Sequence, residues 1–447
     1  MTSFYGFFWN IQQRSRFLRK DNGKIIIFTF SQSVPKFGSH FIQIEKSIDN
    51  LYKMCQAEAM IKREAGQVLL QMARGFPVVA VTGPRQSGKT TLVQALFSKK
   101  PYLSLEDPDV LAFLSADPRG FLDSFPEGAV IDEAQRFPEL FSYLQTVVDR
   151  RKKPGLFILT GSQQFGLLSG ISQSLAGRAG LVQLLPFSLA ELTQAKVKIP
   201  GLRALLFKGL YPPLYDRKLA PPLWHSAYVS TYVERDLRQT LNVKDLSVFQ
   251  TFLRMCAARV GQLLNLSSLA NDCSITHNTA RSWISVLEAS YIIFLLRPHF
   301  RNFGKRLVKT PKIYFYDPGL AAWLLNIQDP AHLAIHPQRG GLFESLIVAE
   351  LLKSRYNRGL ASNFYFWRNN LGDEIDLLID RGSELVPVEI KSGETLNPDL
   401  FKGIHKWKKI AAADNSPAYL VFGGDRALAS GGVSVVPWKT VAGRINP

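Results

Sequence analysis

The sequence predicts an α/β protein with a parallel sheet in its first half, a helical middle part and a second α/β domain towards its C-terminal end. Three observations predict this class. Apolar runs alternate with helical stretches over residues 77–185, as in a parallel sheet that carries helices on both faces. Residues 262–287 have the pattern of two short helices joined by a turn. An apolar helix at residues 342–352 is followed by three consecutive strand-like runs over residues 364–390.

Length and composition place the chain among multidomain globular proteins. At 447 residues it exceeds one ordinary core, so roughly two to four domains are expected. A hydrophobic fraction of 46% with 20% charged residues is typical of this class. No apolar run approaches the roughly 20 residues that span a bilayer, so we expect no membrane segment. Cys55, Cys256 and Cys273 are far apart and form no C-x-x-C pair, which indicates a reducing, cytoplasmic setting without a disulfide framework or zinc site.

The chain is strongly basic, with a net charge of +18 from 54 basic and 36 acidic residues, which favours a polyanionic partner. Residues 1–59 are the hardest part to interpret. A transit peptide, an appendage, and translated sequence upstream of a start at Met54 or Met60 all fit them. We favour the last, because the pattern of the first domain begins only near Ile61.

A glycine-rich loop follows the first strand. Residues 83–90 fit the phosphate-loop pattern G-x-x-x-x-G-K-[ST], with an apolar strand at residues 78–81 before them and a helix at residues 91–97 after them. In this context backbone N–H groups face phosphates, Lys89 reaches the β and γ oxygens, and Thr90 ligates Mg²⁺. The loop therefore predicts binding of ATP or GTP. The predicted contacts are Gly83, Pro84, Arg85, Gln86, Ser87, Gly88, Lys89, Thr90 and Thr91.

Four further strands are expected after the loop, and two of them end in polar residues. Asp132 and Glu133 follow one apolar strand, at the edge where open α/β sheets bind ligands; Asp132 would hold Mg²⁺ and Glu133 would orient the attacking water. Ser162 or Gln163, after the next strand, would face the γ-phosphate, with a turn and helix cap as the alternative. Arg178 is a candidate charge-stabilising finger or an ordinary surface arginine. The expected strands are residues 102–105, 129–131, 156–159 and 181–185.

These motifs together resemble those of prokaryotic AAA-type ATPases that end in a domain of unknown function. The resemblance also includes residues 228–236 and 312–320, and it covers nearly everything from residue 60 onward. It implies a core of about five parallel strands, with Ser162 as the sensor position and Arg178 as a finger or sensor. The signatures are Gly-Pro-Arg-Gln-x-Gly-Lys-Thr-Thr at 83–91, Asp-Glu-Ala-Gln at 132–135, Leu-Thr-Gly-Ser at 159–162 and Leu-Ala-Gly-Arg at 175–178.

Residues 262–287 predict a helix-turn-helix. Ser267 would cap the first helix, and residues 271–274 would supply the turn. In the second helix, Ala280, Ile284 and Leu287 share one face, which would pack inward. The other face carries residue types suited to DNA contact, namely His277, Asn278, Arg281 and Ser282.

A strand at residues 291–296 and a basic segment follow, as in a winged helix. The segment contains no acid, and Phe300 and Phe303 are interleaved with its basic residues. We expect a stripe that faces phosphates, with a protein-contact module as the alternative. The basic residues are Arg297, Arg301, Lys305, Arg306, Lys309 and Lys312.

The C-terminal strands are expected to bring charged residues together. Glu389 and Lys391 point to the same side of one strand because strand side chains alternate, and Asp376 on the preceding strand would converge with them. This constellation resembles the restriction-endonuclease-like fold, in which two acids bind Mg²⁺ and the lysine assists water or the scissile phosphate. Glu344, on the preceding helix, matches the auxiliary acid. Many proteins of this fold only bind, so cleavage is the lesser alternative.

The leading hypothesis is an AAA-type ATPase that hydrolyses ATP with Mg²⁺ and couples its nucleotide state to a DNA-binding C-terminal half. Its catalytic set is Glu133, Lys89, Ser162 and Arg178. The alternatives are a nucleotide-gated, metal-dependent nuclease and a non-hydrolysing nucleotide-bound switch on DNA. ATP and DNA are the expected partners, without a membrane, and assembly into a homo-oligomer is left open. The expected parts are an extension at residues 1–59, an AAA-type domain at 60–195, a helical lid at 196–250, a winged-helix module at 251–325 and a restriction-endonuclease-like domain at 326–447.

Overall fold

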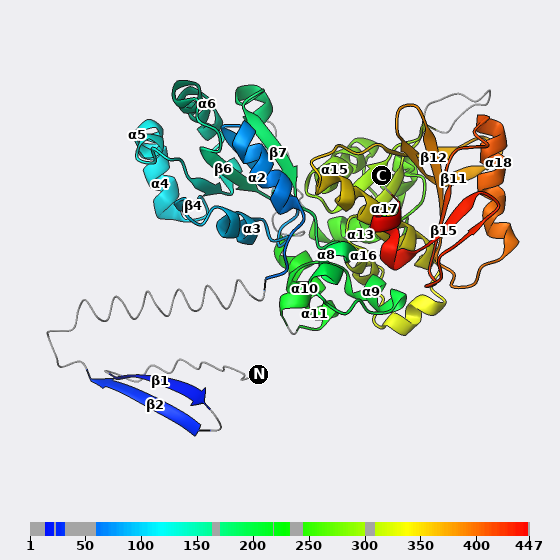
Figure 1. Ribbon diagram of the computed structural model, residues 1–447, viewed down its shortest axis with the longest axis horizontal. Coiled ribbons are helices and arrows are strands. Elements are labelled where there is room, and N and C mark those ends of the chain that lie inside the picture. Colours follow the sequence, from blue (N-terminus) through cyan, green and yellow to red (C-terminus); the bar gives the residue numbers. More distant parts are fainter. Residues whose placement is uncertain are drawn as a thin grey trace. The chain divides into compact units, whose positions relative to one another are not determined.

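The computed structural model forms two compact units, Met1–Met60 and Ile61–Pro447 (Figure 1). In the first unit the strands β1 (Arg14–Asp21) and β2 (Lys24–Ser31) form an antiparallel hairpin. All of the predicted site residues belong to the second unit. The structure describes residues 14–21, 24–31, 60–162, 170–217, 219–232, 245–299 and 309–445.

A five-stranded sheet forms the first part of the second unit, in the order β4-β5-β6-β3-β7. Every pair of neighbouring strands is parallel, so all five strands end at the same edge. This confirms the predicted parallel sheet of about five strands. The predicted strand at 181–185 begins and ends two residues earlier, because Leu184 and Leu185 are core residues beyond the end of the last strand. The strands are β3 (Val78–Thr82), β4 (Tyr102–Ser104), β5 (Val130–Asp132), β6 (Phe157–Gly161) and β7 (Ala179–Gln183).

Helices cover both faces of this sheet, which explains why its central strands β3, β5 and β6 are buried and mostly apolar. Val79 and Val81 pack with the helices on one side, whereas Val78 and Ala80 pack with those on the other. Helices α2 (Ala65–Gly75) and α3 (Lys89–Leu96) belong to the first side. The second side has α4 (Pro108–Ala116), α5 (Pro118–Asp123), the 3₁₀ turn η1 (Ala134–Arg136) and α6 (Leu140–Arg151).

The middle part consists of short helices and a two-stranded antiparallel ribbon, β8-β9. The two helices of the predicted helix-turn-helix are present as α14 and α15, but the first is capped by Asn265 rather than Ser267. Asn265 precedes the helix, and its side-chain oxygen accepts a hydrogen bond from the Ser268 N–H at 3.0 Å. The elements are α8 (Leu189–Gln194), α9 (Leu202–Lys208), α10 (Pro213–Asp216), α11 (Pro221–Tyr228), α13 (Leu246–Ala257), α14 (Leu266–Asp272), α15 (His277–Ala289), β8 (Ile293–Leu296), β9 (Lys312–Phe315), α16 (Pro318–Leu324) and η3 (Pro330–Ala334).

The C-terminal part is a six-stranded mixed sheet, in the order β10-β11-β12-β13-β15-β14. Strands β10, β11 and β12 are antiparallel neighbours, whereas β12, β13 and β15 are parallel to one another. The elements are α17 (Arg339–Tyr356), β10 (Phe364–Arg368), β11 (Glu374–Asp380), β12 (Leu385–Lys391), η4 (Pro398–Phe401), α18 (Lys402–Ala411), β13 (Tyr419–Phe422), β14 (Leu428–Ser430), β15 (Val433–Pro437), η5 (Trp438–Thr440) and α19 (Val441–Arg444).

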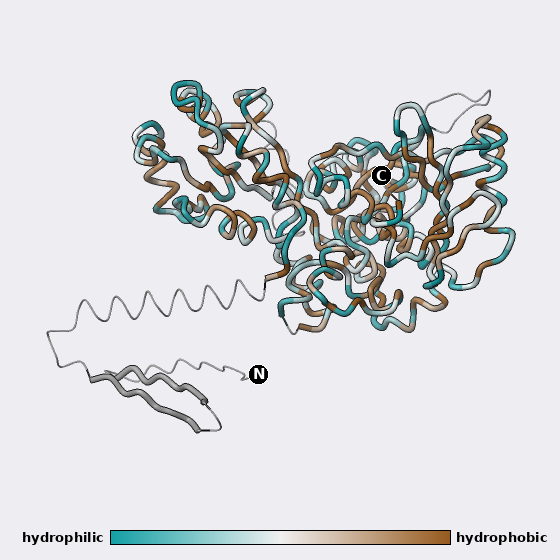
Figure 2. Tube along the Cα trace, in the orientation of Figure 1, coloured by the Kyte–Doolittle hydropathy of each residue, from teal (hydrophilic) through white to brown (hydrophobic). Residues whose placement is uncertain are grey.

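The middle and C-terminal parts share one hydrophobic core. A single cluster of buried residues extends from Leu185 to Ile445, and it includes side chains from α8, α13, β8, α17 and β12. In the second unit, brown hydrophobic stretches of the chain alternate with teal hydrophilic ones (Figure 2). The predicted divisions at 250/251 and 325/326 therefore do not separate independent cores, and the domain limits stay predictions. No helix in the described part of the chain is both long and apolar enough to cross a membrane.

Candidate functional site

The phosphate loop connects β3 to α3 as the sequence predicts. Gly83 has a φ of 149°, and a Cβ there would lie 2.1 Å from the carbonyl oxygen of Leu184, so only glycine fits. Gly88, with a φ of 91°, is the residue just before α3. The first N–H groups of α3 are unpaired within the helix and lie at the carboxyl edge of the sheet. The loop thus has the form of an anion-binding site.

Lys89 is buried at the start of α3. Its ammonium group donates to the carbonyl oxygens of Gly83 at 2.9 Å and Pro84 at 2.8 Å, so it lies over the loop. Burial lowers the pKa of Lys89 to about 8, although Glu133 and Asp132 nearby act in the opposite direction. A phosphate would replace the carbonyl contacts and favour the charged form of the lysine.

Ser87 supplies an independent sign of an anion site. Its side chain is fully buried, and within the described part of the chain its hydroxyl has no hydrogen-bond partner. A buried hydroxyl without a partner costs free energy, which a bound phosphate oxygen would recover.

Asp132, at the end of β5, accepts hydrogen bonds from three hydroxyl groups. Thr90 donates to it at 3.1 Å and Tyr102 at 2.5 Å, and Thr160 at the end of β6 donates to its other oxygen. The Thr90 hydroxyl and the Asp132 carboxylate are oxygen ligands of the kind that Mg²⁺ prefers, so this pair fits a metal bound with a nucleotide. Burial and the carboxylate raise the pKa of Tyr102, which therefore stays a hydroxyl donor. Thr160 belongs to the Leu-Thr-Gly-Ser signature, but its bond to Asp132 was not predicted, and Tyr102 was not expected at the site, since no spacing rule links a hydroxyl to an acid on a neighbouring strand.

Glu133 and Ser162 also meet at this edge of the sheet. The Ser162 hydroxyl, directly after β6, donates to the Glu133 carboxylate at 3.1 Å. Gln135 donates to the same carboxylate oxygen. Glu133 has a φ of 54°, an uncommon value for a residue with a side chain, which is typical of functional sites. The structure therefore brings Lys89, Asp132, Glu133 and Ser162 to the loop, whereas Gln163 lies outside the described residues.

Arg178 is not near its own phosphate loop. Its carbonyl oxygen accepts the N–H of Val78, the first residue of β3, so Arg178 lies at the opposite edge of the sheet. Its guanidinium forms a two-point ion pair with Asp149 at 2.6 and 2.9 Å. Arg178 therefore cannot act as a finger for the nucleotide of its own chain, because the length of β3 separates its guanidinium from the phosphate loop. It stays a prediction that Arg178 acts on the nucleotide of a neighbouring copy of the chain.

Helices beyond the sheet also contact the loop. Trp224 of α11 donates to the Gln86 side chain at 3.0 Å, and the ring of Tyr232 lies 5.4 Å from the Arg85 guanidinium. The Thr82 hydroxyl, just before the loop, bonds with the Tyr291 hydroxyl at 2.7 Å. These contacts could not be predicted from the sequence, because a lone aromatic residue is usually a core residue.

The C-terminal acids converge as the strand alternation predicts. Lys391 of β12 lies between Asp376 of β11 at 2.9 Å and Glu389 at 2.6 Å. The backbone N–H of Ile390 also donates to Asp376 at 2.8 Å. Burial would raise the pKa of Asp376, but Lys391 and Lys312 outweigh it and the pKa is lowered. Burial and Asp376 raise the pKa of Glu389 to about 9, so one proton and one lysine neutralise this pair of acids at neutral pH.

Glu344, the predicted auxiliary acid on α17, is held by β9. It accepts a hydrogen bond from Lys312 at 2.9 Å and another from Tyr314. Lys312 is 3% exposed and also pairs with Glu374. Its inclusion in a phosphate-facing stripe was therefore wrong, because its ammonium group is buried between two carboxylates. Burial and Asp376 raise the pKa of Glu344 to about 7.

These acids do not fit a second metal ion. Each has a lysine as its direct partner, so the position that a divalent cation would take between them is neutralised by ammonium groups. Within the described ranges, no group of three or more His, Cys, Asp or Glu side chains is arranged to hold a metal. The cluster has the composition of a buried ion-pair network.

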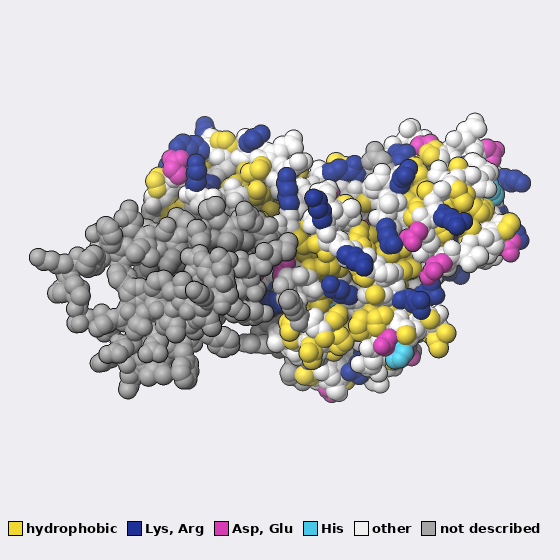
Figure 3. Space-filling view, turned by 60° about the horizontal axis from the view of Figure 1, so that its bottom comes forward, with side chains coloured by type: hydrophobic (Ala, Val, Ile, Leu, Met, Phe, Trp, Pro, Cys, Tyr) yellow, Lys and Arg dark blue, Asp and Glu magenta, His cyan; other side chains and the backbone are white. Residues whose placement is uncertain are grey.

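The predicted DNA-contacting face of α15 is exposed. His277, Asn278, Arg281 and Ser282 lie in solvent, whereas Ala280 and Leu287 are buried. Arg297 and Lys309 are exposed as well, but the stretch from Phe300 to Arg306 lies outside the described residues. The face of the molecule in Figure 3 carries Lys and Arg side chains at many separate places. DNA contact thus stays a prediction.

Three family models match the chain in succession. Residues 75–193 match an AAA domain, residues 199–331 match a Domain of unknown function (DUF8612), and residues 339–441 match a Domain of unknown function (DUF4143). The first match confirms the predicted AAA-type domain, and the third confirms that a domain of unknown function follows it.

Uncharacterized proteins of Mycobacterium tuberculosis and Mycobacterium bovis are each 34% identical over 339 residues, which covers 75% of this chain and 74% of each relative. An uncharacterized protein of Haemophilus influenzae is 22% identical over 367 residues, covering 75% of this chain and 87% of its own length. Among solved structures, a Walker-type ATPase of Pyrococcus abyssi aligns with a TM-score of 0.42 and 18% identity, over 59% of this chain and 96% of its own.

Proposed function

Since the chain belongs to the family of these uncharacterized mycobacterial proteins, an AAA-type ATPase family with a C-terminal domain of unknown function, we propose that it hydrolyses ATP with Mg²⁺. The observation that carries the proposal is the meeting of Lys89, Thr90, Asp132, Glu133 and Ser162 at one edge of the sheet. These are the groups needed to hold a triphosphate and to position water for in-line attack.

The chain's own residues divide this work. The loop N–H groups and the Ser87 hydroxyl would bind phosphate oxygens, and Lys89 would neutralise charge on the β and γ groups. Thr90 and Asp132 would hold Mg²⁺, which supplies further charge neutralisation at those oxygens. Glu133 would orient the attacking water and accept its proton, with Ser162 holding the carboxylate in place at 3.1 Å. Arg178 would act only on the nucleotide of a neighbouring copy.

We further propose that the nucleotide state is passed to a C-terminal half that contacts DNA through the exposed face of α15. The support is that face itself, together with the shared core that joins α13, α15 and α17. The nuclease alternative is disfavoured by the lysines that neutralise the C-terminal acids. The non-hydrolysing switch differs from our proposal only in turnover.

The test is ATP turnover by the purified chain, with and without duplex DNA. We expect turnover in the wild type and a loss of about 100-fold or more in Lys89→Ala, because the charge on the phosphates is then not neutralised. Glu133→Gln should keep ATP binding but lose turnover. Lys99→Ala, which removes an exposed lysine just beyond α3, is the matched control and should behave as the wild type.

Lys89→Ala protein that hydrolyses ATP at the wild-type rate would contradict the proposal. Tight ATP binding without turnover in the wild type would favour the switch. If Arg281→Ala changes neither the DNA-dependent turnover rate nor the affinity for duplex DNA, α15 does not contact DNA as we propose.

A further inference from the structure

Arg63 lies directly beside the phosphate loop but belongs to no motif of the loop. It comes just before α2 and is 7% exposed, although it is an arginine. Its guanidinium donates to the carbonyl oxygen of Ser87 at 2.6 Å and to that of Leu185 at 2.6 Å. Its Nε forms an ion pair with Glu191 at 3.0 Å. The side chain thus joins the loop, the segment after β7 and helix α8.

The Ser87 contact bears on how the loop holds phosphate. The carbonyl of Ser87 and the N–H of Gly88 belong to the same planar peptide and point in opposite directions. By holding the carbonyl, Arg63 fixes the direction in which the Gly88 N–H points, immediately before Lys89. A fixed N–H group next to the predicted phosphate position binds an anion better than one that must first be ordered.

Glu191 connects Arg63 to the start of α8. One of its carboxylate oxygens accepts the N–H of Glu64 at 2.9 Å, and the other accepts the N–H of Ser188 at 2.9 Å. Ser188 in turn caps the helix by accepting the Glu191 N–H at 3.0 Å. Glu191 is completely buried, so loss of Arg63 would leave an unpaired charge in the core.

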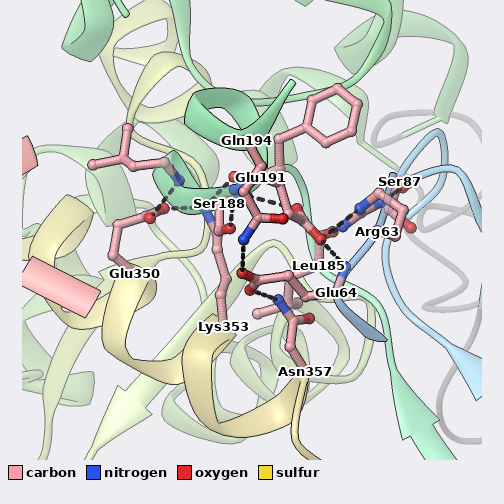
Figure 4. Close-up of polar contacts among 12 residues, drawn as sticks. Arg63, Glu64, Ser87, Leu185, Ser188, Glu191, Gln194, Glu350, Lys353 and Asn357 are labelled. Carbon is pink, nitrogen blue, oxygen red and sulfur yellow. Dashed lines mark hydrogen bonds and ion pairs between the residues drawn. The ribbon is translucent and has the colours of Figure 1, made fainter. Parts of the chain in front are cut away.

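Helix α17 of the C-terminal part contacts the same segment from the other side (Figure 4). Glu350 accepts the N–H of Leu189 at 2.7 Å, and Lys353 donates to the carbonyl oxygen of Phe187 at 2.9 Å. Glu350 and Lys353 also pair with each other at 2.7 Å, and both are buried. The three residues 187–189 therefore lie between the Arg63–Glu191 pair and α17.

A second contact leads from α17 to the residue beside Arg63. Asn357 donates to the Glu64 carboxylate at 3.1 Å, and Gln194 of α8 donates to its other oxygen at 3.0 Å. The contacts of Glu64 and Glu191 thus link the first residues of the unit, α8 and α17 in one continuous polar network (Figure 4). Since buried polar networks lose several bonds when one member moves, a shift of α17 would be felt at Arg63.

We infer that Arg63 is a positioning residue that couples the conformation of the phosphate loop to the position of α17 against residues 187–189. The C-terminal half thereby controls how tightly the loop binds ATP. The inference rests on the proposed nucleotide site and adds that α17 of the same chain regulates this site. By reciprocity, ATP at the loop stabilises the contacts of α17 with residues 187–189.

Calorimetric titration of the full chain with Mg·ATP tests the inference. We expect Arg63→Ala to weaken ATP binding by about 10-fold or more, and millimolar guanidinium to restore part of the lost affinity. Asn357→Ala, which changes the residue directly after α17 rather than a residue of the loop, should weaken binding by about threefold to tenfold. Lys62→Ala, an exposed neighbour of Arg63, should bind as the wild type.

The binding results separate the role of Arg63, the link to α17 and the nucleotide site itself. If Arg63→Ala does not fold, Arg63→Lys replaces it, since lysine keeps the charge but cannot reach three acceptors at once. ATP affinity within twofold of wild type in a folded Arg63 variant would overturn the positioning role. Unchanged affinity in both Asn357→Ala and Glu350→Gln would overturn the link to α17. Failure of the wild type itself to bind ATP would instead overturn the proposed nucleotide site.

Discussion

The phosphate loop and the C-terminal acid cluster look alike in the sequence and differ in the structure. Each consists of carboxylates near strand ends with a lysine close by. At the loop, Asp132 is surrounded by hydroxyl groups, and Lys89 is bonded to backbone carbonyl oxygens. In the C-terminal cluster, Asp376 and Glu389 share Lys391, whose ammonium group lies between them.

The two sites differ in the charge of the groups that contact their acids. Hydroxyl and carbonyl partners carry no charge, so they leave room for the anion and the cation that we propose for Lys89 and Asp132. The C-terminal acids already have their cations, because Lys391 and Lys312 lie within ion-pair distance. Acids at strand ends therefore indicate where a site could be, while their partners decide whether a ligand is needed there.

A large loss of stability is expected when Lys312 loses its charge. Lys312→Met would leave Glu344 and Glu374 without their buried partner, which should lower the free energy of unfolding by about 3–5 kcal/mol. Urea unfolding followed by circular dichroism measures it. Lys309→Met changes an exposed lysine on the same segment and should cost about 0.5 kcal/mol or less. A loss below about 1 kcal/mol at Lys312 would show that the cluster does not depend on its internal cation.

A second effect is expected in the pH dependence of stability. Burial raises the pKa of Glu389 from an ordinary value of 4.5 to about 9, so the folded protein holds a proton that the unfolded chain releases between these pH values. Stability from this group is therefore fully present below pH 4.5 and falls as the pH rises towards 9. Glu389→Gln cannot titrate, so its unfolding free energy should fall less between pH 5 and pH 9.

The control for that experiment is Glu394→Gln, which changes an exposed acid nearby and should keep the wild-type slope. Equal slopes for Glu389→Gln and the wild type would mean that Glu389 is ionised in the folded protein, as a metal ligand would be.

Local patterns predicted the first sheet well because its central strands β3, β5 and β6 are buried on both faces and therefore mostly apolar. The same rule placed β7 two residues too late, since Leu184 and Leu185 are apolar core residues that follow the strand. At the loop, glycine positions and the lysine are set by backbone geometry within a few residues, so a pattern could find them.

What the sequence could not predict depends on contacts between distant residues. Lys312 belongs to a basic segment, and only its pairing with Glu344, thirty-two residues away, shows that it faces inward. Arg63 contacts Ser87, Leu185 and Glu191, which lie 24 to 128 residues further along the chain. A single arginine before a helix carries no pattern, so its position beside the loop became evident only in the fold.

We propose that the acids at the phosphate loop take a metal together with a nucleotide, whereas the C-terminal acids take none because they are paired with Lys312 and Lys391. Calorimetric titration of Mn²⁺ into the purified chain, with and without a non-hydrolysable ATP analogue, tests it directly. The account predicts metal binding only when the analogue is present, and its loss in Asp132→Asn. Mn²⁺ binding without nucleotide that disappears in Asp376→Asn would contradict the account, because the C-terminal acids would then be a metal site.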